Sequence, residues 1–262
     1  MDLAINTVGD ELQSSANFCR AEGIGLEISD FAFPWNLDSN LKNLIDKHIQ
    51  AVEGIQPLIC HGPFFELNVV SFDQAIKDVC RQRHRAALDA AKAVGVGTYV
   101  AHTNFNPMIR HPFYHSKFAD RLLDFWLPFA DIAAKSEIVI VFENHWESRP
   151  EILAEMVHKA DHPNLKASFD NGHALVFSST GAADWIRILG ADLYHCHLHD
   201  NDGELDQHQA IGTGKEDWLK LISALRNYAA NVISVVESDH LEKNMAGLAQ
   251  LRGLLEASEQ EI

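Results

Sequence analysis

The sequence is short of positive charge. Its 262 residues hold 21 Lys and Arg against 37 Asp and Glu, which gives a formal net charge of −16. Proteins that bind the phosphate backbone of a nucleic acid usually have Lys and Arg clustered on one surface. No such run occurs along this chain, which argues against a nucleic-acid partner without excluding one.

Long apolar runs and paired cysteines are also missing. No apolar stretch is long enough to span a bilayer, and residues 1–13 have neither the basic nor the apolar segment of a secretory signal. The cysteines, Cys19, Cys60, Cys80 and Cys196, have no CxxC spacing, which is typical of reduced thiols. We therefore expect a cytoplasmic protein without a membrane partner.

Histidine, by contrast, is abundant. The chain has 15 histidines, and His is both the commonest metal ligand and the side chain that titrates near neutral pH. Residues 194–214, YHCHLHDNDGELDQHQAIGTG, hold His195, His197, His199 and His208 together with several acidic residues. So dense a group indicates a functional site whose other members come from elsewhere in the chain.

Short apolar runs alternate with longer amphipathic segments along the whole chain. The expected strands cover residues 3–8, 24–29, 56–61, 97–102, 138–143, 165–170, 192–199 and 232–237. The expected helices cover residues 10–23, 37–54, 72–94, 116–135 and 181–189, with others starting near 150, near 215 and after 237. This alternation predicts a parallel sheet. Eight such units predict an α/β fold, a single (β/α)8 TIM barrel forming one domain over residues 1–262.

An open, doubly wound sheet is the structural alternative. No glycine-rich phosphate loop follows the first expected strand, so a dinucleotide-binding fold of that class has little support.

Metal-type side chains recur where the expected strands end or shortly after. They are His61, His102, Glu143, Asp170, His173, His197, Asp206, His208 and Glu237. Because the C-terminal ends of barrel strands meet on one face, we expect these side chains to share a pocket. Mixed imidazole and carboxylate ligands suit Zn, Mn, Fe or Co, and a buried group of carboxylates needs a cation to offset its repulsion. The pattern predicts a divalent metal site.

Each piece has a plainer interpretation when it is taken alone. The segment 61–63 is a strand end with a turn, 170–173 is a turn, and 200–206 is a solvated loop or a poor calcium loop. The recurrence of such residues at six successive strand ends favours the shared site.

Seven short motifs carry a resemblance to a known superfamily. HGPF (61–64), AHTN (101–104), FEN (142–144), DNGH (170–173), HLHDND (197–202), DQHQAIGTG (206–214) and VVES (235–238) resemble motifs of the xylose isomerase-like TIM barrels. That superfamily includes sugar phosphate isomerases and epimerases and the apurinic/apyrimidinic endonuclease family 2. The resemblance covers nearly the whole chain and is more specific to the superfamily than to one reaction.

Two branches of the superfamily imply different uses of these residues. Similarity to the tagatose and psicose epimerases implies one metal held by Glu143, Asp170, His197 and Glu237. Glu143 and Glu237 are then the catalytic acid/base pair, and His173 is a further catalytic or substrate-binding residue. The remaining positions bind substrate or additional metal: His61, His102, Asp206 and His208. Similarity to endonuclease IV implies instead three zinc ions held by all nine residues.

We favour the isomerase or epimerase branch. Residues 144–150, NHWESRP, and 174–180, ALVFSST, differ from the small-residue runs of endonuclease IV, and the loops are neutral or acidic. This branch implies a sugar, sugar phosphate or keto-polyol as small-molecule substrate, with Zn, Mn, Co or Mg at one ion per chain and up to three allowed. A dehydratase using the same proton abstraction and a metal-bearing binding protein are alternatives, and a homo-oligomer stays open.

Several residues keep two interpretations. Trp35, Phe64, Phe65 and Trp146 either pack against the apolar face of a sugar or serve ordinary packing. The segment Gly212–Lys215 is either a phosphate site before a helix or a loop turn. His195 and His199 are left unassigned.

Overall fold

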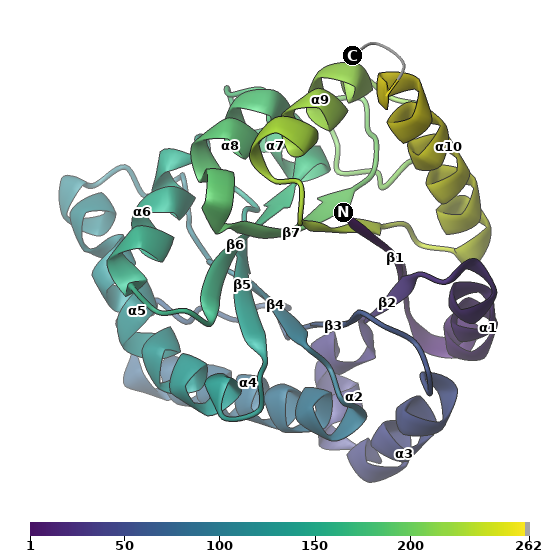
Figure 1. Cartoon of the computed structure of the whole chain (residues 1–262). Coiled ribbons are helices and arrows are strands. Elements are labelled where there is room, and N and C mark those ends of the chain that lie inside the picture. The colour runs from purple at the N-terminus through teal and green to yellow at the C-terminus, as the bar shows by residue number, and fades with distance from the viewer. Residues whose placement is uncertain (260–262) are drawn as a thin grey trace.

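Eight parallel strands close on themselves in chain order, because each strand bonds to the next and β8 bonds back to β1. The structure is a computed structural model and describes residues 1–259. The strands are β1 (Asp2–Thr7), β2 (Gly25–Ile28), β3 (Leu58–His61), β4 (Thr98–His102), β5 (Val139–Glu143), β6 (Leu165–Asp170), β7 (Leu193–Leu198) and β8 (Ile233–Val236). Figure 1 shows the helices arranged as an outer layer around this barrel. The predicted α/β class and TIM barrel are confirmed.

The outer helices follow the strands along the chain. They are α1 (Leu12–Glu22), α2 (Pro34–Asp38), α3 (Leu41–Ala51), α4 (Gln74–Val94), α5 (Pro112–Ala134), α6 (Glu151–Ala160), α7 (Asn171–Phe177), α8 (Ala182–Leu189), α9 (Trp218–Tyr228) and α10 (Leu241–Glu259). Short 3₁₀ turns cover Gly9–Glu11, Asp30–Ala32 and Gly190–Asp192. No helix within residues 1–259 is long and apolar enough to cross a membrane.

The helices differ from the sequence prediction in number and in where some begin. Helices α2 and α7 are additional, and α9 begins at Trp218 rather than near residue 215. Helix α5 begins at Pro112 rather than at 116, because proline suits the first turn and His111 caps it with its ring. Helix α7 forms because Asp170 Oδ1 accepts the backbone N–H of His173 at 2.7 Å, so this segment starts a helix instead of a turn.

The predicted single domain over residues 1–262 stays a prediction, and its last three residues lie outside the described part of the chain.

A small apolar cluster fills part of the barrel interior. Its buried members are Ala4, Ile59, Val100, Val141, Ile233 and Val235. Because strand side chains alternate between two faces, the residues two positions further along these strands also point inward. On four of these strands, two residues beyond a cluster member stand His61, His102, Glu143 and Glu237. The apolar cluster therefore forms a floor beneath the candidate site.

Candidate metal centre

The barrel register brings the candidate ligands from neighbouring strands side by side. His102 pairs with Glu143 across β4 and β5, and Asp170 pairs with His197 across β6 and β7. Each of these side chains is buried. Alternate inward positions at the C-terminal ends of the strands thus build one cluster from residues far apart in the sequence.

The first group of potential ligands is formed by His61, His102 and Glu143. His61 Nε2 lies 3.3 Å from Glu143 Oε2, and His102 Nε2 lies 3.4 Å from the same oxygen. All three side chains are buried at the ends of β3, β4 and β5.

The second group shares Glu143 with the first and adds Asp170 and His197. His197 Nδ1 lies 3.3 Å from Glu143 Oε1 and 3.7 Å from Asp170 Oδ2. The same ring nitrogen lies 3.4 Å from an oxygen, Oε2, of Glu237, which directly follows β8. The four residues expected to hold a single metal therefore surround one point.

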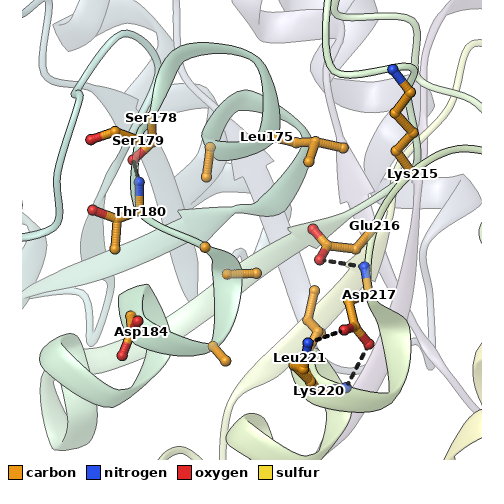
Figure 2. A pocket seen from close by; sticks show the side chains of 14 residues that line it. Leu175, Ser178, Ser179, Thr180, Asp184, Lys215, Glu216, Asp217, Lys220 and Leu221 are labelled. Atoms are coloured by element: carbon orange, nitrogen blue, oxygen red, sulfur yellow. Dashed lines mark hydrogen bonds and ion pairs between the residues drawn. The ribbon is translucent and has the colours of Figure 1, made fainter.

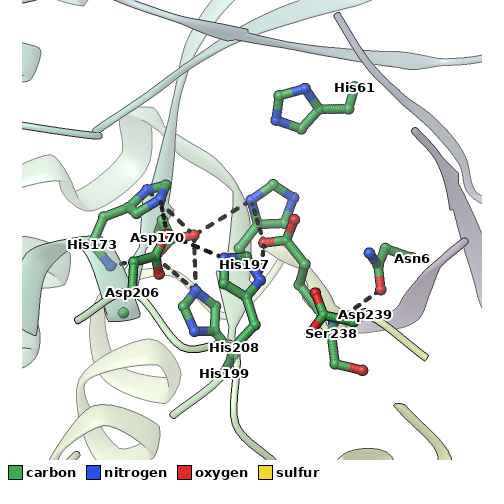
Figure 3. A network of polar contacts seen from close by, with 12 residues as sticks. Asn6, His61, Asp170, His173, His197, His199, Asp206, His208, Ser238 and Asp239 are labelled. Carbon is green, nitrogen blue, oxygen red and sulfur yellow. Dashed lines mark hydrogen bonds and ion pairs between the residues drawn. The ribbon is translucent and has the colours of Figure 1, made fainter. Parts of the chain in front are cut away.

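The third group is formed by His173, Asp206 and His208. Asp206 Oδ2 lies 3.3 Å from His173 Nε2 and 3.3 Å from His208 Nε2. Figure 3 shows these three side chains beside Asp170 and His197. All nine predicted positions thus meet in the structure. Three of them lie outside the strands and the residues that directly follow them: His173 on α7, and Asp206 and His208 in the segment after β7.

Three imidazoles are oriented so that one ring nitrogen is engaged and the other faces the carboxylates. His61 Nδ1 lies 2.9 Å from the carbonyl oxygen of the next residue, and His173 Nδ1 lies 2.9 Å from the carbonyl oxygen of Asn144. His197 Nε2 lies 3.0 Å from a carboxylate oxygen of Glu27. Such outer hydrogen bonds fix the tautomer of metal-ligating histidines, so the remaining nitrogens are free to bind a cation.

The orphaned atoms at the centre fit a divalent metal. Glu143 Oε2 and His197 Nδ1 are buried, and neither has a hydrogen bond of good geometry within residues 1–259. Their close neighbours are the side chains of the three groups, at ion-pair distances. Buried polar atoms without a partner are costly, and nitrogen and carboxylate oxygen together are the donor set that Zn and similar ions prefer. The buried residues can therefore hold a metal.

Charge complementarity inside the cluster changes the titration of its members. Burial opposes ionisation of Glu143, but the imidazoles of His197 and His102 outweigh it and hold the pKa of Glu143 well below its usual value. Burial likewise opposes protonation of His197, but Glu237 and Glu27 raise its pKa well above the usual value. The carboxylate of Glu143 is therefore ionised at neutral pH and available to bind a cation.

Glu27 is a member of this network that the sequence analysis missed. It is fully buried on β2, and its carboxylate accepts from His195 Nε2 at 3.1 Å as well as from His197. His195 is held in turn by Ser168 Oγ, 2.8 Å from its Nδ1. A lone acidic residue inside the apolar run IGLEI was the available signal, because an unpaired carboxylate is rarely buried.

His199, also left unassigned, supports Asp170. Its Nε2 lies 3.2 Å from the Asp170 carboxylate, and its ring approaches the chain so closely that a Cβ on Gly172 would lie 1.9 Å from it. The glycine of the DNGH motif is thus required by the close approach of His199.

The segment between β7 and α9 folds around the buried carboxylate of Asp200. This carboxylate accepts the backbone N–H groups of Gly212 at 3.0 Å and Glu216 at 3.1 Å, and the indole N–H of Trp218 at 2.8 Å. A Cβ on Gly214 would lie 2.3 Å from Asp200 Oδ1. In the segment Gly212–Lys215, the N–H of Gly212 is thus engaged by Asp200, that of Thr213 bonds to the carbonyl of Ala210 at 3.1 Å, and that of Lys215 bonds to the carbonyl of Asn201 at 2.9 Å. These contacts favour the loop interpretation over a phosphate site.

Seven of the nine candidate ligands line a cavity of about 270 Å³: His61, His102, Glu143, His173, Asp206, His208 and Glu237. Phe33 and Phe64 line it together with His145, which sequence analysis did not select. Phe33 packs on Trp35 at 4.9 Å and on Phe65 at 5.2 Å between ring centroids, and Phe64 stacks on Phe65 at 4.2 Å. These four rings form an aromatic wall. Trp146 is instead half-exposed and packs on His145 at 4.5 Å.

Residues 19–257 match the sequence profile of one protein family, the xylose isomerase-like TIM barrel. The chain belongs to this family. The expectation drawn from the seven motifs is therefore confirmed.

Solved structures and a sequence relative agree with this assignment of the fold. A D-tagatose 3-epimerase-like protein is 24% identical with a TM-score of 0.80, covering 100% of this chain and 99% of its own. A protein from Thermus thermophilus, solved after soaking with ZnCl₂, is 25% identical with a TM-score of 0.81, covering 98% and 99%. An uncharacterised protein of Methanocaldococcus jannaschii is 24% identical over 78% of this chain and 72% of its own length.

Proposed function

We propose that the protein is a divalent-metal-dependent isomerase or epimerase acting on a sugar or a sugar-like carbonyl compound. One observation carries the proposal: Glu143 and Glu237, from β5 and the end of β8, approach the same ring nitrogen of His197 at 3.3 and 3.4 Å. Two carboxylates reaching one point from different strands suit proton transfer on two faces of a substrate. Membership of the xylose isomerase-like family supports an enzyme, and the name of the D-tagatose 3-epimerase-like structure supports the reaction class.

The proposed mechanism divides the work between the two glutamates. One carboxylate removes the proton from the carbon next to the substrate carbonyl, and the other carboxylic acid returns a proton to the neighbouring position or to the opposite face. A divalent ion, when bound by Glu143, Asp170, His197 and Glu237, polarises the substrate oxygens and stabilises the negative charge that develops. His173, which lines the same cavity, is proposed to hold a substrate hydroxyl. A dehydratase would share the same proton abstraction.

The aromatic wall supports a sugar-sized substrate. Phe33 and Phe64 line the cavity together with the polar groups, and aromatic faces pack well against the C–H face of a sugar. The remaining predicted residues, His61, His102, Asp206 and His208, also line the cavity and are proposed to bind substrate or additional metal.

A second candidate function rests on the three ligand groups. Each of the three groups is compact enough to hold an ion. They are His61 with His102 and Glu143, Glu143 with Asp170 and His197, and His173 with Asp206 and His208. Three ions would suit a phosphodiesterase of the endonuclease IV type. The formal net charge of −16 opposes a DNA substrate.

Metal analysis and two assays test both candidates. We expect about one divalent ion, Zn, Mn, Co or Mg, per chain purified without chelator, and interconversion of ketoses by the loaded protein. Glu143→Gln and Glu237→Gln should each lower kcat by at least ~10²-fold, because each removes a proton-transfer group. Three zinc ions per chain, cleavage of abasic-site DNA and no action on ketoses would replace the proposal with the phosphodiesterase. A cytoplasmic location and a homo-oligomer stay predictions.

A further inference from the structure

A second cavity, of about 460 Å³, lies away from the metal ligands. Two segments at the C-terminal end of the barrel line it: residues 62–73, which follow β3, and residues 103–111, which follow β4. Helix α5 contributes Arg121 to its wall. None of the residues that line this cavity belongs to the three ligand groups or lines the metal cavity.

Arg121 carries a positive charge that no acidic side chain neutralises. Within residues 1–259 it has no ion pair, and its buried Nη1 has no hydrogen-bond partner. Its guanidinium lies over the ring of Phe72, with Cζ 3.7 Å from the ring centroid, and burial lowers its pKa. Arginines elsewhere in this acidic chain, such as Arg83 with Asp38, bond to carboxylates. Stacking holds the guanidinium plane in place but leaves its N–H donors unused.

Two carboxamides add further donors to the same cavity. Asn104 Oδ1 accepts the N–H of Val69 at 3.2 Å, and Asn106 Oδ1 accepts the N–H of Met108 at 2.9 Å. The oxygens of both amides are therefore engaged, while both Nδ2 groups have no partner in the described residues. Asp73, the acidic residue at this cavity, accepts the N–H of Ala75 at 2.8 Å as a helix cap. The cavity therefore combines several free donors with a single carboxylate, that of Asp73.

The cleft in Figure 2 has the opposite character. It is lined by Asp184, Glu216 and Asp217 as well as by two lysines, and Lys220 is paired with Asp217 at 2.6 Å. An anion in that cleft would meet three carboxylates, so the Arg121 cavity is the better match for negative charge.

We propose that the Arg121 cavity binds a small oxyanion, a phosphate or carboxylate group, through the guanidinium of Arg121 and the amide nitrogens of Asn104 and Asn106. A guanidinium fork binds both kinds of oxyanion with two parallel hydrogen bonds. The volume leaves space for a carbon skeleton attached to the oxyanion. This inference does not depend on the reaction proposed for the metal centre.

Calorimetric titration of the metal-loaded protein with inorganic phosphate, and separately with acetate, tests the site. Arg121→Gln should weaken binding roughly tenfold or more, because it removes a charge-assisted pair of hydrogen bonds. Asn104→Asp should weaken it at least as much, since the new carboxylate keeps the acceptor for Val69 and repels the anion. The matched control is Arg85→Gln, which removes an equal charge from an exposed position on α4 paired with Asp89.

The outcomes separate the sources of the oxyanion. Tighter binding of phosphate that depends on Arg121 identifies a phosphate site, and tighter binding of acetate identifies a carboxylate site. A ketose phosphate that binds more tightly than phosphate, again only with Arg121 present, shows that the oxyanion arrives attached to a sugar. Absence of binding, or equal binding to wild type and Arg121→Gln, overturns the inference. An anion bound at the metal itself would be insensitive to Arg121.

Discussion

One buried carboxylate sets the orientation of the central imidazole. Glu27 has no exposed surface, and both its oxygens lie within 3.1 Å of His197 Nε2. The ring must then present Nδ1 to Glu143 and Glu237, which approach it at 3.3 and 3.4 Å. Glu27 is therefore a positioning residue, because it acts on the site through His197 without lining the metal cavity.

Replacing Glu27 with Gln should weaken metal binding more than it changes the fold. The amide retains one acceptor oxygen but turns an N–H toward the ring N–H groups, so His197 loses its fixed tautomer. We expect metal affinity to fall by roughly 10- to 100-fold, as outer hydrogen-bond partners of metal ligands usually show. Competition with a chromogenic chelator measures this, and Glu53→Gln, at an exposed position, is the control. Unchanged affinity in Glu27→Gln would contradict the positioning role.

The sequence predicted some residues of the site and missed others for a physical reason. His61, Glu143 and Asp170 each end an apolar strand, so the barrel pattern alone places them on one face. Glu27 lies inside β2 and His195 inside β7. The apolar neighbours of Glu27 mark it as unusual, but nothing in the local sequence indicates which residue pairs with it. Their contact joins residues 168 positions apart on two strands that are not neighbours, so it depends on closure of the barrel where β8 bonds to β1.

At the scale of elements, the segment from Asp200 to Trp218 positions one side of the metal centre. Asp200 and Gln209 form an antiparallel bridge, and the Asp200 carboxylate ties both ends of the loop together. Between them the chain carries Asp206 and His208, and His208 adopts a positive φ of 44°. The geometry of the third ligand group therefore depends on a residue that does not belong to it.

Asp200→Ala should disorder the loop between Asp200 and Trp218. The third ligand group, His173 with Asp206 and His208, should then no longer bind an ion. Removing the acceptor leaves several buried N–H groups unpaired, which we expect to cost about 3 kcal/mol of unfolding free energy. Chemical denaturation measures that loss, and Asp124→Ala, at an exposed position on α5, is the control. Where the wild type holds an ion at His173, Asp206 and His208, the variant should lose it and keep the central one. A variant with wild-type stability would show that other contacts hold the loop.

Patterns along the chain do not determine where helices α7 and α9 start. The sequence analysis predicted no helix directly after Asp170, where α7 forms, and placed the start of α9 near Lys215. The caps that decide the actual starts are Asp170 for α7 and Asp217 for α9, whose side chain accepts from the N–H of Lys220 at 3.3 Å. Several aspartates lie near each boundary, and the sequence alone does not show which of them caps the helix. The aspartate that acts as the cap depends on the tertiary contacts of the loop.

At the scale of the whole molecule, the barrel encloses a group of ionised side chains that a metal would stabilise. We expect saturating divalent ion to raise Tm, since a ligand at about 1,000 times its Kd adds about 4 kcal/mol to the unfolding free energy. Calorimetric scans with and without added ion measure the shift, and a chelator should reverse it. In Asp170→Asn, which loses a central ligand, the shift should shrink; a shift of full size would place the ion elsewhere.

Metal binding should also release protons, and the direction follows from the raised pKa values of the site histidines. Burial opposes protonation of His208, yet Glu237 and Asp206 raise its pKa to about 9; Asp170 and Asp206 likewise raise the pKa of His173 against burial. These imidazoles therefore hold protons at pH 7 in the metal-free protein. A histidine that binds an ion directly must be neutral, and a cation bound beside a protonated imidazole also disfavours its proton. Apparent metal affinity should rise with pH until the pH passes about 9, where His208 is already neutral. Titration calorimetry in buffers of different ionisation enthalpy counts the released protons, and His208→Gln should release fewer. A heat independent of the buffer at pH 7 would show that the ion binds without displacing these protons.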